Sequence, residues 1–468
     1  MTLWTASDAA MATGGRAIGD WSVTGFGIDS RAMQPGAMFV ALNAARDGHD
    51  FVHAALDAGA AAALVSRIPG GCENAPLLLV EDVQAALEAL GRAGRARTRA
   101  RVIAVTGSVG KTSTKEMLRH CLGAQGTTHA AIKSYNNHWG VPLTLAAIPP
   151  DADFAVIEIG MNHPGEIAPL SALARPHVAA VINVAPVHLE AFDDGVAGIA
   201  REKAAIFAGL EPDGVAIWNA DVAEANILRD AGGTVSFGAV ATADWRLTQV
   251  LPGSDSTTCA AGTPVGDVMF RIGAPGAHFA MNALAALAAV YAAGGDVARA
   301  ALSLAGWTPP DGRGARHAIV LHPDHPSVDL IDDAYNANPA SVGAALDLLA
   351  AAEVPGRARR IALLGDMKEL GPTGPDLHAD LADHRAMARI DTVHTVGPLM
   401  RHLHDALPAD RRGIHAEDTA AFGPSLRDLV GPGDAVLVKG SLSMNMAQLV
   451  DGLRALGDGP TGTTPQNG

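Results

Sequence analysis

The sequence predicts a multidomain α/β protein, on three observations. Short apolar runs followed by helical patterns recur from end to end, which is typical of βα units with parallel strands. Residues 102–114 combine an apolar strand, a glycine-punctuated turn and a helix start, as in phosphate-binding α/β domains. The chain has 468 residues, too many for one ordinary core. It has no internal repeat with a period of about 20–50 residues, so a repeat architecture is excluded.

The first block, residues 1–98, has the pattern of a small α/β domain. We expect its strands at residues 38–42, 63–66 and 77–80, and its helices at 51–58 and 83–93. A basic stretch at 92–101 follows, and we interpret it as a solvated helix end or a linker at a domain boundary.

The second block, residues 99–313, is expected to contain a mostly parallel sheet. Its strands are predicted at 102–105, 154–159, 178–184 and 215–219, and a helix at 279–293. That helical run is rich in alanine, carries Asn282, and is shorter than the roughly 20 residues that cross a membrane. We therefore expect a buried helix there, and a domain end near residues 312–314.

The third block, residues 314–456, is expected to form a small Rossmann-like domain. Its strands are predicted at 328–331, 360–364, 392–396 and 435–438, and each precedes a helix-like segment, as in doubly wound folds. The remaining residues, 457–468, are rich in Gly, Pro and Thr, so we expect a disordered tail.

The composition narrows the possible functions. The formal net charge of −15 repels a phosphate backbone, so we expect no nucleic-acid partner. Cys72, Cys121 and Cys259 are far apart and lack CxxC spacing, so neither a disulfide framework nor a zinc site is indicated. The N-terminus has no basic segment followed by an apolar core, so we expect no secretory signal. We expect a cytoplasmic monomer without a membrane anchor.

Residues 102–114 read VIAVTGSVGKTST and predict a phosphate-binding loop. Gly107 and Gly110 permit backbone conformations that point successive N–H groups inward, and the following helix N-terminus adds positive potential. Lys111 supplies a charge for the β and γ phosphates, and Thr112 can reach Mg²⁺. The general motif has its first glycine where this chain has Val105. The residues expected around the nucleotide phosphates are Thr106, Gly107, Ser108, Val109, Gly110, Lys111, Thr112 and Ser113.

Three further residues form a candidate metal set. Glu158 ends a predicted strand, where a carboxylate is placed to meet the metal of a bound nucleotide; its alternative role is a capping carboxylate. His188 follows the next strand and is either a metal ligand or a hydrogen-bonding loop residue. Lys203 lies on a helical segment at 196–210 and, taken alone, would be an ordinary surface lysine.

Taken together, these motifs resemble the Mur ligase family. The first block contains Asp29-Ser-Arg and Asp47-Gly-His, and the second contains the compact phosphate loop TGSVGKT at residues 106–112. The resemblance covers nearly the whole chain apart from its C-terminal tail. It implies a UDP-binding first domain, a central P-loop ATPase-type domain with a mostly parallel sheet, and a C-terminal Rossmann-like domain.

The resemblance also implies cofactors and residue roles. ATP and two Mg²⁺ ions are expected, with Glu158 and His188 as metal ligands and Lys203 as a lysine carbamylated by CO₂. A carbamate is an anionic oxygen ligand, whereas a free ammonium would repel Mg²⁺. Helix-face packing is an equal alternative for His278. The residues implied to contact the nucleotide beyond the loop are His278, Asn282, Arg313 and Asp333, and the implied catalytic set is Lys111, His188, Lys203 and Arg313.

Five stretches resemble the branch of the family that joins D-alanyl-D-alanine to UDP-N-acetylmuramoyl-tripeptide. They are SYNNHWGVPLT (134–144), EIGMNHPGEI (158–167), DDAYNANPAS (332–341), LGDMKELG (364–371) and VKGS (438–441). Taken one by one, each stretch has an alternative interpretation: the Asn pair could form a turn, DDAYNANP could be the exit from a strand, and Lys439 could be a solvated lysine. The residues implied to contact the substrates are Asp29, Ser30, Arg31, Asp47, His49, Asn136, Asn137, Tyr335, Asn336, Asn338 and Lys439.

The implied reaction proceeds through an acyl phosphate, which the amine of the dipeptide then attacks. The sequence identifies no general base; His188 and Asp333 are geometric candidates. The alternatives are a sibling ligase that adds the third amino acid, a folylpolyglutamate synthase, and a nucleotide-binding regulatory protein. The UDP-type first block disfavours the folate enzyme, and the metal set with a full third domain disfavours the regulatory protein.

Overall fold

The computed structural model describes residues 1–457, apart from the side chains of residues 423 and 424. The tail predicted at 457–468 lies outside this range except for Gly457. The chain divides into two compact units. The first contains Met1–Asn183, Ala200–Trp245 and Leu284–Ser303, and the second contains Val184–Ile199, Arg246–Ala283 and the residues from Leu304 onward. The domain limits expected at residues 98 and 313 stay predictions.

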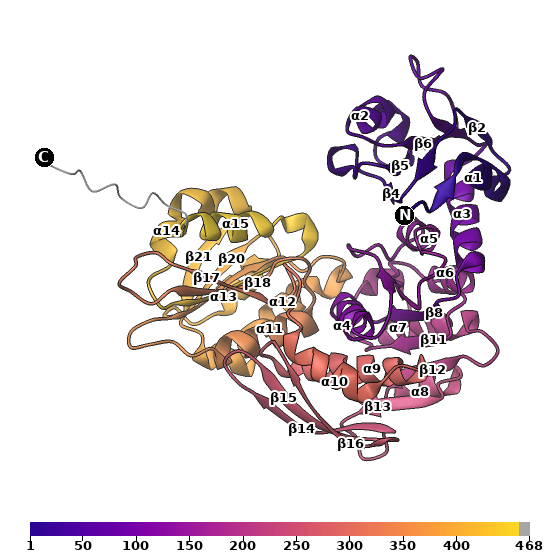
Figure 1. Cartoon of the computed structure of the whole chain (residues 1–468). Helices are drawn as coiled ribbons and strands as arrows, with labels where there is room; N and C mark the ends of the chain where they lie inside the picture. Colours follow the sequence, from indigo (N-terminus) through magenta and orange to yellow (C-terminus); the bar gives the residue numbers. More distant parts are fainter. Residues whose placement is uncertain (458–468) are drawn as a thin grey trace, which may run out of the picture. The chain divides into compact units, whose positions relative to one another are not determined.

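A five-stranded sheet forms the N-terminal part of the first unit, in the order β2-β7-β6-β5-β4 (Figure 1). Only β2 runs antiparallel to its neighbour. The central strands β5 and β6 are buried along their whole length, as parallel strands with two covered faces require. The elements here are β1 (Trp4–Thr5), α1 (Ala6–Thr13), β2 (Arg16–Ile18), β3 (Ser22–Val23), β4 (Gly25–Gly27), β5 (Ala37–Val40), α2 (Val52–Asp57), β6 (Ala62–Val65), β7 (Leu77–Leu79) and α3 (Val83–Arg97).

Helix α3 corrects the interpretation of the basic stretch at 92–101. The helix continues to Arg97, four residues beyond the predicted end. Arg95 is buried and its guanidinium lies 3.2 Å from Glu211. The guanidinium carbon of Arg97 lies 3.8 Å from the ring centroid of Trp4. Arg95 and Arg97 are therefore packed within the first unit, whereas Arg92, Arg99 and Arg101 of the same stretch are exposed.

The phosphate loop belongs to a parallel sheet in the first unit, in which β13, β12, β11, β8, β10 and β9 lie in that order. Strand β8 lies between β10 and β11, with Val105 beside Glu158 and Thr106 beside Val181. Carboxyl ends of parallel strands share one edge, so the loops after these three strands open together. The strands are β8 (Arg101–Thr106), β9 (Thr128–Ala130), β10 (Phe154–Glu158), β11 (Val178–Val181), β12 (Val215–Asn219) and β13 (Val235–Gly238).

The helices of this part connect the strands or run alongside them (Figure 1). Helix α9 matches the predicted apolar helix, and its residues from Ala283 to Val290 are buried, as expected. Among the described residues, no helix is long and apolar enough to cross a membrane. The helices are α4 (Lys111–Gly123), α5 (Gly140–Ala146), α6 (Ile167–Ala174), α7 (Gly195–Ala204), α8 (Ala225–Asp230), α9 (Ala277–Ala292) and α10 (Val297–Ser303).

Three antiparallel strands follow that the sequence patterns did not predict. They are β14 (Trp245–Pro252), β15 (Thr257–Thr263) and β16 (Gly266–Ile272), joined in sequence by short turns. Their residues alternate only weakly between buried and exposed positions. Without a clear period of two, periodicity alone cannot find such strands.

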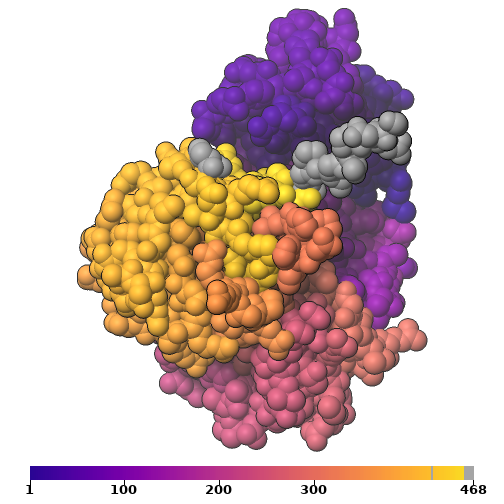
Figure 2. All heavy atoms as spheres, turned by 90° about the vertical axis from the view of Figure 1, so that its left-hand side faces the viewer, coloured from indigo at the N-terminus to yellow at the C-terminus, as the bar shows by residue number. Residues whose placement is uncertain are grey.

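The second unit contains a six-stranded sheet in the order β17-β18-β22-β19-β20-β21, and only β17 is antiparallel to its neighbour. One face packs against α11 and α13, and the other against α14 and α15, so the sheet is covered on both sides as predicted. These orange and yellow elements form one compact body (Figure 2). The elements are β17 (Ala315–Ile319), β18 (Val328–Asp333), α11 (Pro339–Ala351), β19 (Arg360–Gly365), α12 (Gly374–Ala379), β20 (Thr392–Val396), α13 (Met400–Ala406), β21 (Arg412–Ala416), α14 (Leu426–Leu429), β22 (Ala435–Lys439) and α15 (Ala447–Ala455).

Candidate active site

The predicted phosphate loop lies between β8, which ends at Thr106, and α4, which begins at Lys111. Gly110 has a φ of 80°, a left-handed conformation that glycine adopts without a Cβ clash. Lys111 folds back over the loop, and its Nζ donates to the carbonyl oxygen of Gly107 at 2.6 Å. The loop thus places a cation and the N–H groups of a helix N-terminus at the same point, which suits an anionic ligand.

Asn183, which the sequence analysis did not single out, fixes the shape of this loop. Its side-chain oxygen accepts from Val109 N at 2.9 Å, and its carbonyl oxygen accepts from Ser108 N at 3.2 Å. Asn183 comes two residues after β11, whose carboxyl end lies beside that of β8. An amide at the end of a neighbouring strand is therefore part of the phosphate site.

Thr112 and Glu158 meet directly beside the loop. The hydroxyl of Thr112 donates to Glu158 Oε2 at 2.9 Å, and the amide of Asn136 donates to Glu158 Oε1 at 2.8 Å. The Ser134 hydroxyl lies 3.0 Å from Thr112 Oγ1. Glu158 is buried, with 1% of its surface exposed. It does not cap a helix, because it ends β10 and contacts these side chains instead.

This group of side chains fits a hard divalent cation. A hydroxyl and a buried carboxylate at a phosphate loop are the oxygen ligands that Mg²⁺ prefers beside nucleotide phosphates. Burying a carboxylate is costly unless it is paired or coordinates a metal, and the described hydrogen bonds to Glu158 come from a neutral hydroxyl and a neutral amide. Thr112 and Glu158 are thus the described residues best suited to hold Mg²⁺.

Lys203 is buried, although its position on a helix would by itself suggest an ordinary surface lysine. It lies at the end of α7 and only 1% of its surface is exposed. Its Nζ lies 3.7 Å from Met161 Sδ, a weak acceptor. Burial, together with the charge of Lys111, lowers the pKa of Lys203 well below its usual value. Burial therefore shifts the equilibrium of this side chain toward the neutral amine.

His188 lies in the second unit, in contact with Glu369. Its Nδ1 is 2.5 Å from Glu369 Oε2. Both residues have left-handed backbone conformations, with φ of 53° for His188 and 66° for Glu369. Non-glycine residues rarely adopt this conformation outside functional or turn positions. Glu369 was not among the predicted site residues, although it lies in the quoted stretch LGDMKELG.

A second cluster of charge lies where β18 and β22 end side by side. Lys439 Nζ donates to Asp333 Oδ2 at 2.6 Å and to the carbonyl oxygen of Asn336 at 2.8 Å. Burial raises the pKa of Asp333, while Lys439 opposes that shift. Asn338 begins α11 with a capping box, in which its side chain accepts from Ser341 N at 2.9 Å. Lys439 is thus a buried ion-pair partner, and Asn338 has a structural role that is independent of any substrate.

Arg313, whose charge acts on Asp333, packs on an aromatic ring. Its guanidinium carbon is 4.0 Å from the ring centroid of Tyr335. The loop that carries Arg313 is anchored by Asp332, which accepts from Gly312 N at 2.7 Å. The guanidinium is stacked on the ring, and its planar set of N–H donors suits recognition of a phosphate.

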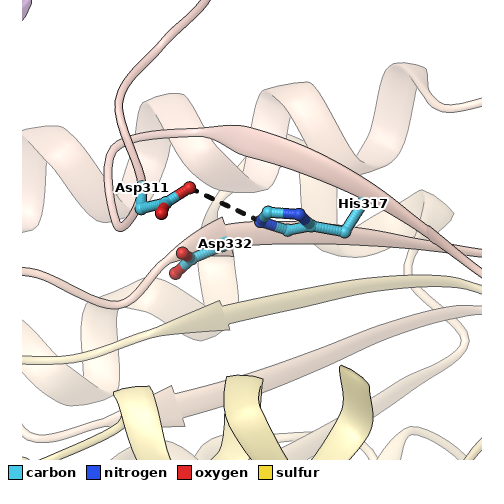
Figure 3. A group of neighbouring side chains, drawn as sticks. All are labelled: Asp311, His317 and Asp332. Atoms are coloured by element: carbon cyan, nitrogen blue, oxygen red, sulfur yellow. Dashed lines mark ion pairs between the residues drawn. The ribbon is translucent and has the colours of Figure 1, made fainter. Parts of the chain in front are cut away.

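Asp311, His317 and Asp332 bring atoms capable of binding metal within 4.8 Å of one another (Figure 3). His317 Nε2 lies 3.9 Å from Asp311 Oδ1. However, the two oxygens of Asp332 already accept backbone N–H groups of Gly312 and Ala334, and the Asp311 side chain is 80% exposed. This cluster therefore orders the loop that leads to Arg313.

His278 and Asn282 occupy the first turns of α9, which begins two residues before the helix predicted at 279–293. The His278 ring lies 4.0 Å from that of Phe279, and burial lowers the pKa of His278 to about 4. Asn282 is buried. A neutral imidazole and a buried amide can both recognise a nucleobase edge through hydrogen bonds. The contact with the Phe279 ring also supports the alternative that His278 serves only in packing on the helix face.

In the N-terminal sheet, Asp29 and Arg31 form a local pair after β4. Asp29 caps a 3₁₀ turn at Ser30–Ala32 and accepts from the Arg31 guanidinium at 2.8 and 2.9 Å. The hydrogen bond from Arg31 lowers the pKa of Asp29 to about 2. The Arg31 side chain is 83% exposed, so its guanidinium can donate hydrogen bonds to a ligand.

Asp47 and His49 form a structural link in the same sheet. Asp47 Oδ1 lies 2.6 Å from His49 Nδ1, and His49 Nε2 accepts from Ser66 N at 2.9 Å. His49 is buried, with 5% of its surface exposed. The pair fastens the loop after β5 to the end of β6. Asn137 also has a structural contact, because its side chain accepts from Gly140 N at the start of α5.

A phosphate loop at the carboxyl edge of a parallel sheet, with a hydroxyl and a buried carboxylate beside it, defines an α/β protein of the nucleotide-binding class. Comparisons with known protein families are more specific. The Mur ligase middle domain matches residues 105–290, the Mur ligase glutamate ligase domain matches 316–442, and the Mur ligase family catalytic domain matches 22–95. The chain belongs to the Mur ligase family, and it is a ligase.

Relatives of known activity match over almost their full length. The UDP-N-acetylmuramoyl-tripeptide–D-alanyl-D-alanine ligase of Escherichia coli K12 is 37% identical, covering 92% of this chain and 93% of that protein. The Bacillus subtilis ligase of the same name is 33% identical, with the same coverage. A crystal structure of MurF from Acinetobacter baumannii superposes with a TM-score of 0.82 at 30% identity, covering 97% of this chain and 99% of that one. The predicted three-domain α/β fold class is confirmed.

Proposed function

We propose that this protein is an ATP-dependent ligase that joins D-alanyl-D-alanine to UDP-N-acetylmuramoyl-tripeptide. The observation that carries this proposal is the 37% identity to a ligase of that name across 92% of the chain. The quoted stretches of the sequence support it, and so does the phosphate loop with Thr112 and Glu158 at 2.9 Å. The product is the UDP-muramoyl-pentapeptide precursor of the cell wall. We also propose a cytoplasmic location, because ATP and UDP-linked precursors are cytoplasmic substrates. A monomeric state is part of the same proposal.

The first step activates the tripeptide. Its C-terminal carboxylate attacks the γ phosphorus of ATP, forming an acyl phosphate and releasing ADP. Lys111 and Arg313 offset charge on the transferring phosphoryl group, while the loop N–H groups hold the other phosphates. Bound Mg²⁺ would neutralise further charge at the β and γ phosphates. His278, Asn282 and Asp333 are proposed to contact the nucleoside.

The second step forms the peptide bond. The amine of D-alanyl-D-alanine attacks the acyl carbon, the C–O bond to phosphate breaks, and inorganic phosphate leaves. The attacking amine must lose its proton, and the departing phosphate or water can accept it. Asp333 remains a candidate for this role, and His188 is the alternative only if its imidazole does not bind a metal. An acyl phosphate exposed to water would hydrolyse, so closure around the substrates must precede this step.

We also propose that Lys203 is carbamylated in the active enzyme and binds a metal together with Thr112, Glu158 and His188. Lys203 is buried and its described polar contact is Met161 Sδ at 3.7 Å. A neutral amine reacts with CO₂ and gives an anionic oxygen ligand, whereas an ammonium beside Lys111 would meet like charge.

For the UDP-linked substrate we propose Asp29, Ser30 and Arg31 as contacts, with Asp47 and His49 supporting the neighbouring loop. Asn136, Asn137, Tyr335, Asn336, Asn338 and Lys439 are proposed to line the path of the peptide substrates. Several of these residues also make the structural contacts described above. Tyr335 acts through Arg313, and Asn338 through the start of α11.

The decisive experiment measures ADP release from the purified protein against a panel of UDP-muramoyl peptides, with and without D-alanyl-D-alanine. We expect release that requires both the tripeptide and the dipeptide. Release with UDP-muramoyl-dipeptide and a free amino acid would indicate the sibling ligase. Release that is independent of both peptides would indicate a nucleotide-binding regulatory protein.

A further inference from the structure

Lys115 is a fully buried lysine on α4, one helical turn after Lys111. Its side chain has 0% exposure. The Nζ donates to the carbonyl oxygen of Ala131 at 2.6 Å and to that of Lys133 at 3.3 Å, and it lies 3.0 Å from Glu116 Oε1. An ammonium has three N–H donors, so these contacts account for all of them. Burying this charge is costly, and its two carbonyl partners lie on one particular loop.

These carbonyl groups lie in residues 131–137, which form most of the connection 131–139 between β9 and α5. Ile132, between the two carbonyl groups that Lys115 binds, is 95% exposed. Burial of that apolar side chain therefore does not hold this part of the loop. The two carbonyl groups turn inward toward one ammonium, and the side chain between them turns outward. Lys115 is thus the main described anchor for the start of the loop.

The far end of the same loop reaches the two side chains proposed to bind Mg²⁺. Ser134 lies 3.0 Å from Thr112 Oγ1, and Asn136 donates to Glu158 Oε1 at 2.8 Å. The Asn136 carbonyl oxygen also accepts from Gly160 N at 2.8 Å, two residues after Glu158. A shift at Ala131 or Lys133 would therefore move both contacts at once.

We propose that Lys115 is a positioning residue for the metal–nucleotide site: it clamps the loop 131–137 so that Ser134 and Asn136 orient Thr112 and Glu158. The inference rests on the proposed function, which makes these two side chains Mg²⁺ ligands. Lys115 does not touch the nucleotide in this assignment. Partners that orient metal ligands typically change metal affinity or activity by about 10–100-fold when they are removed.

The test compares nucleotide binding with and without Mg²⁺. Binding of ADP is measured by calorimetry in EDTA and in saturating Mg²⁺, for the wild type, Lys115→Met and Arg119→Met. Methionine matches the length of lysine but has no N–H donor. Arg119 is the matched control, because it lies on the same helix and also pairs with Glu116, at 2.6 Å, while its side chain is 55% exposed.

We expect Lys115→Met to bind ADP in EDTA within about twofold of the wild type, because Lys111 and the loop N–H groups are intact. Its gain in affinity on adding Mg²⁺ should be smaller by about 10-fold or more. Arg119→Met should behave like the wild type. Asn136→Ala removes the hydrogen bond between the loop and Glu158 and keeps Lys115, so it should show the same loss of Mg²⁺-dependent affinity. The double variant should lose little more than either single variant.

Three outcomes would overturn the inference. One is an unchanged Mg²⁺ gain in Lys115→Met. Another is an equal loss of affinity with and without Mg²⁺. The third is failure to fold by both Lys115→Met and the milder Lys115→Gln, because Lys115 would then support the whole unit. If the wild type itself shows no Mg²⁺-dependent gain, the proposed metal site fails instead.

Discussion

Glu369 and His188 form a close contact within one compact unit, with 2.5 Å between Glu369 Oε2 and His188 Nδ1. A histidine that binds metal through one ring nitrogen commonly gives its other N–H to a carboxylate, which fixes the tautomer. With Nδ1 engaged by Glu369, Nε2 is the nitrogen left for a metal. The contact therefore extends the proposed metal set to a residue that the sequence analysis did not select.

We predict that Glu369→Gln lowers kcat/KM by about 10-fold or more and raises the Mg²⁺ concentration needed for half-maximal rate. The amide can still form a hydrogen bond, but it orients the imidazole more weakly than a carboxylate does. Steady-state kinetics over a Mg²⁺ titration measures this. Glu81→Gln, at an exposed position, is the control. An unchanged Mg²⁺ requirement would leave Glu369 without a part in the metal site.

Lys111→Ala should keep the fold and lose turnover. The lysine lies over the phosphate loop, 2.6 Å from Gly107 O, where charge develops during phosphoryl transfer. Removing such a group costs roughly 3 kcal/mol or more of transition-state stabilisation, that is, at least about 100-fold in kcat. Circular dichroism and ADP-release kinetics measure the two properties. Arg101→Ala, at the opposite end of β8, should be normal. Near-normal turnover of Lys111→Ala would refute the assignment of the loop.

Arg31→Ala should weaken binding of the UDP-linked substrate alone. The exposed guanidinium, held by Asp29 at 2.8 Å, offers donors that suit a diphosphate. We expect the KM for that substrate to rise by about 10-fold with little change in kcat or in the KM for D-alanyl-D-alanine. Arg16→Ala, exposed on β2 of the same sheet, is the control. Equal KM values for Arg31→Ala and the wild type would mean that the UDP site lies elsewhere.

Lys203 should carry a carbamate in the active enzyme. Because burial, and then the charge of Lys111, lower the pKa of Lys203, its neutral amine can react with CO₂ at a pH well below its ordinary pKa. Lys203→Ala should be nearly inactive and regain part of its activity with added short carboxylates, which can fill the vacated oxygen position. Lys203→Arg, which cannot be carbamylated, should stay inactive. Activity of the wild type should fall after acid treatment and CO₂ removal and return with bicarbonate.

A carbamate signal in carbon-13 NMR after exchange with labelled bicarbonate tests the modification directly. A bicarbonate-indifferent enzyme without that signal would contradict it. Lys203 would then act as a direct contact to phosphate.

The pair of Asp333 and Lys439 should set the acid limb of the pH–rate profile. Burial raises the pKa of Asp333, and Lys439, whose Nζ is 2.6 Å away, opposes the shift. A nucleoside hydroxyl needs the ionised carboxylate as acceptor, so activity falls as pH drops through this pKa. Lys439→Met removes the stabilising charge, so the pKa rises further and the limb moves to higher pH. The profile of kcat/KM for ATP measures this, and an unmoved limb would count against it.

The strands and the phosphate loop were accessible from the sequence because their signals are local. The strands predicted at 215–219 and 392–396 match β12 and β20 residue for residue. The others match within a few residues, because a continuous apolar run shows where a buried strand lies and not where its last hydrogen bond forms. The roles of Gly110 and Lys111 could likewise be predicted from the order of the residues around them. The family resemblance supplied Glu158, His188 and Lys203 as a set.

The tertiary structure decided which side chains meet, because contacts between distant residues leave no periodic signal in a single sequence. Asn183 holds the phosphate loop from 74 residues away, and Lys115 anchors a loop 16 residues further along. The arginines at the end of α3 looked like a linker by composition and are packed in the fold, since a planar guanidinium can be buried against an aromatic ring. The sequence by itself determined the fold class, the family and the phosphate chemistry. Burial and distance determined which polar residues orient the others.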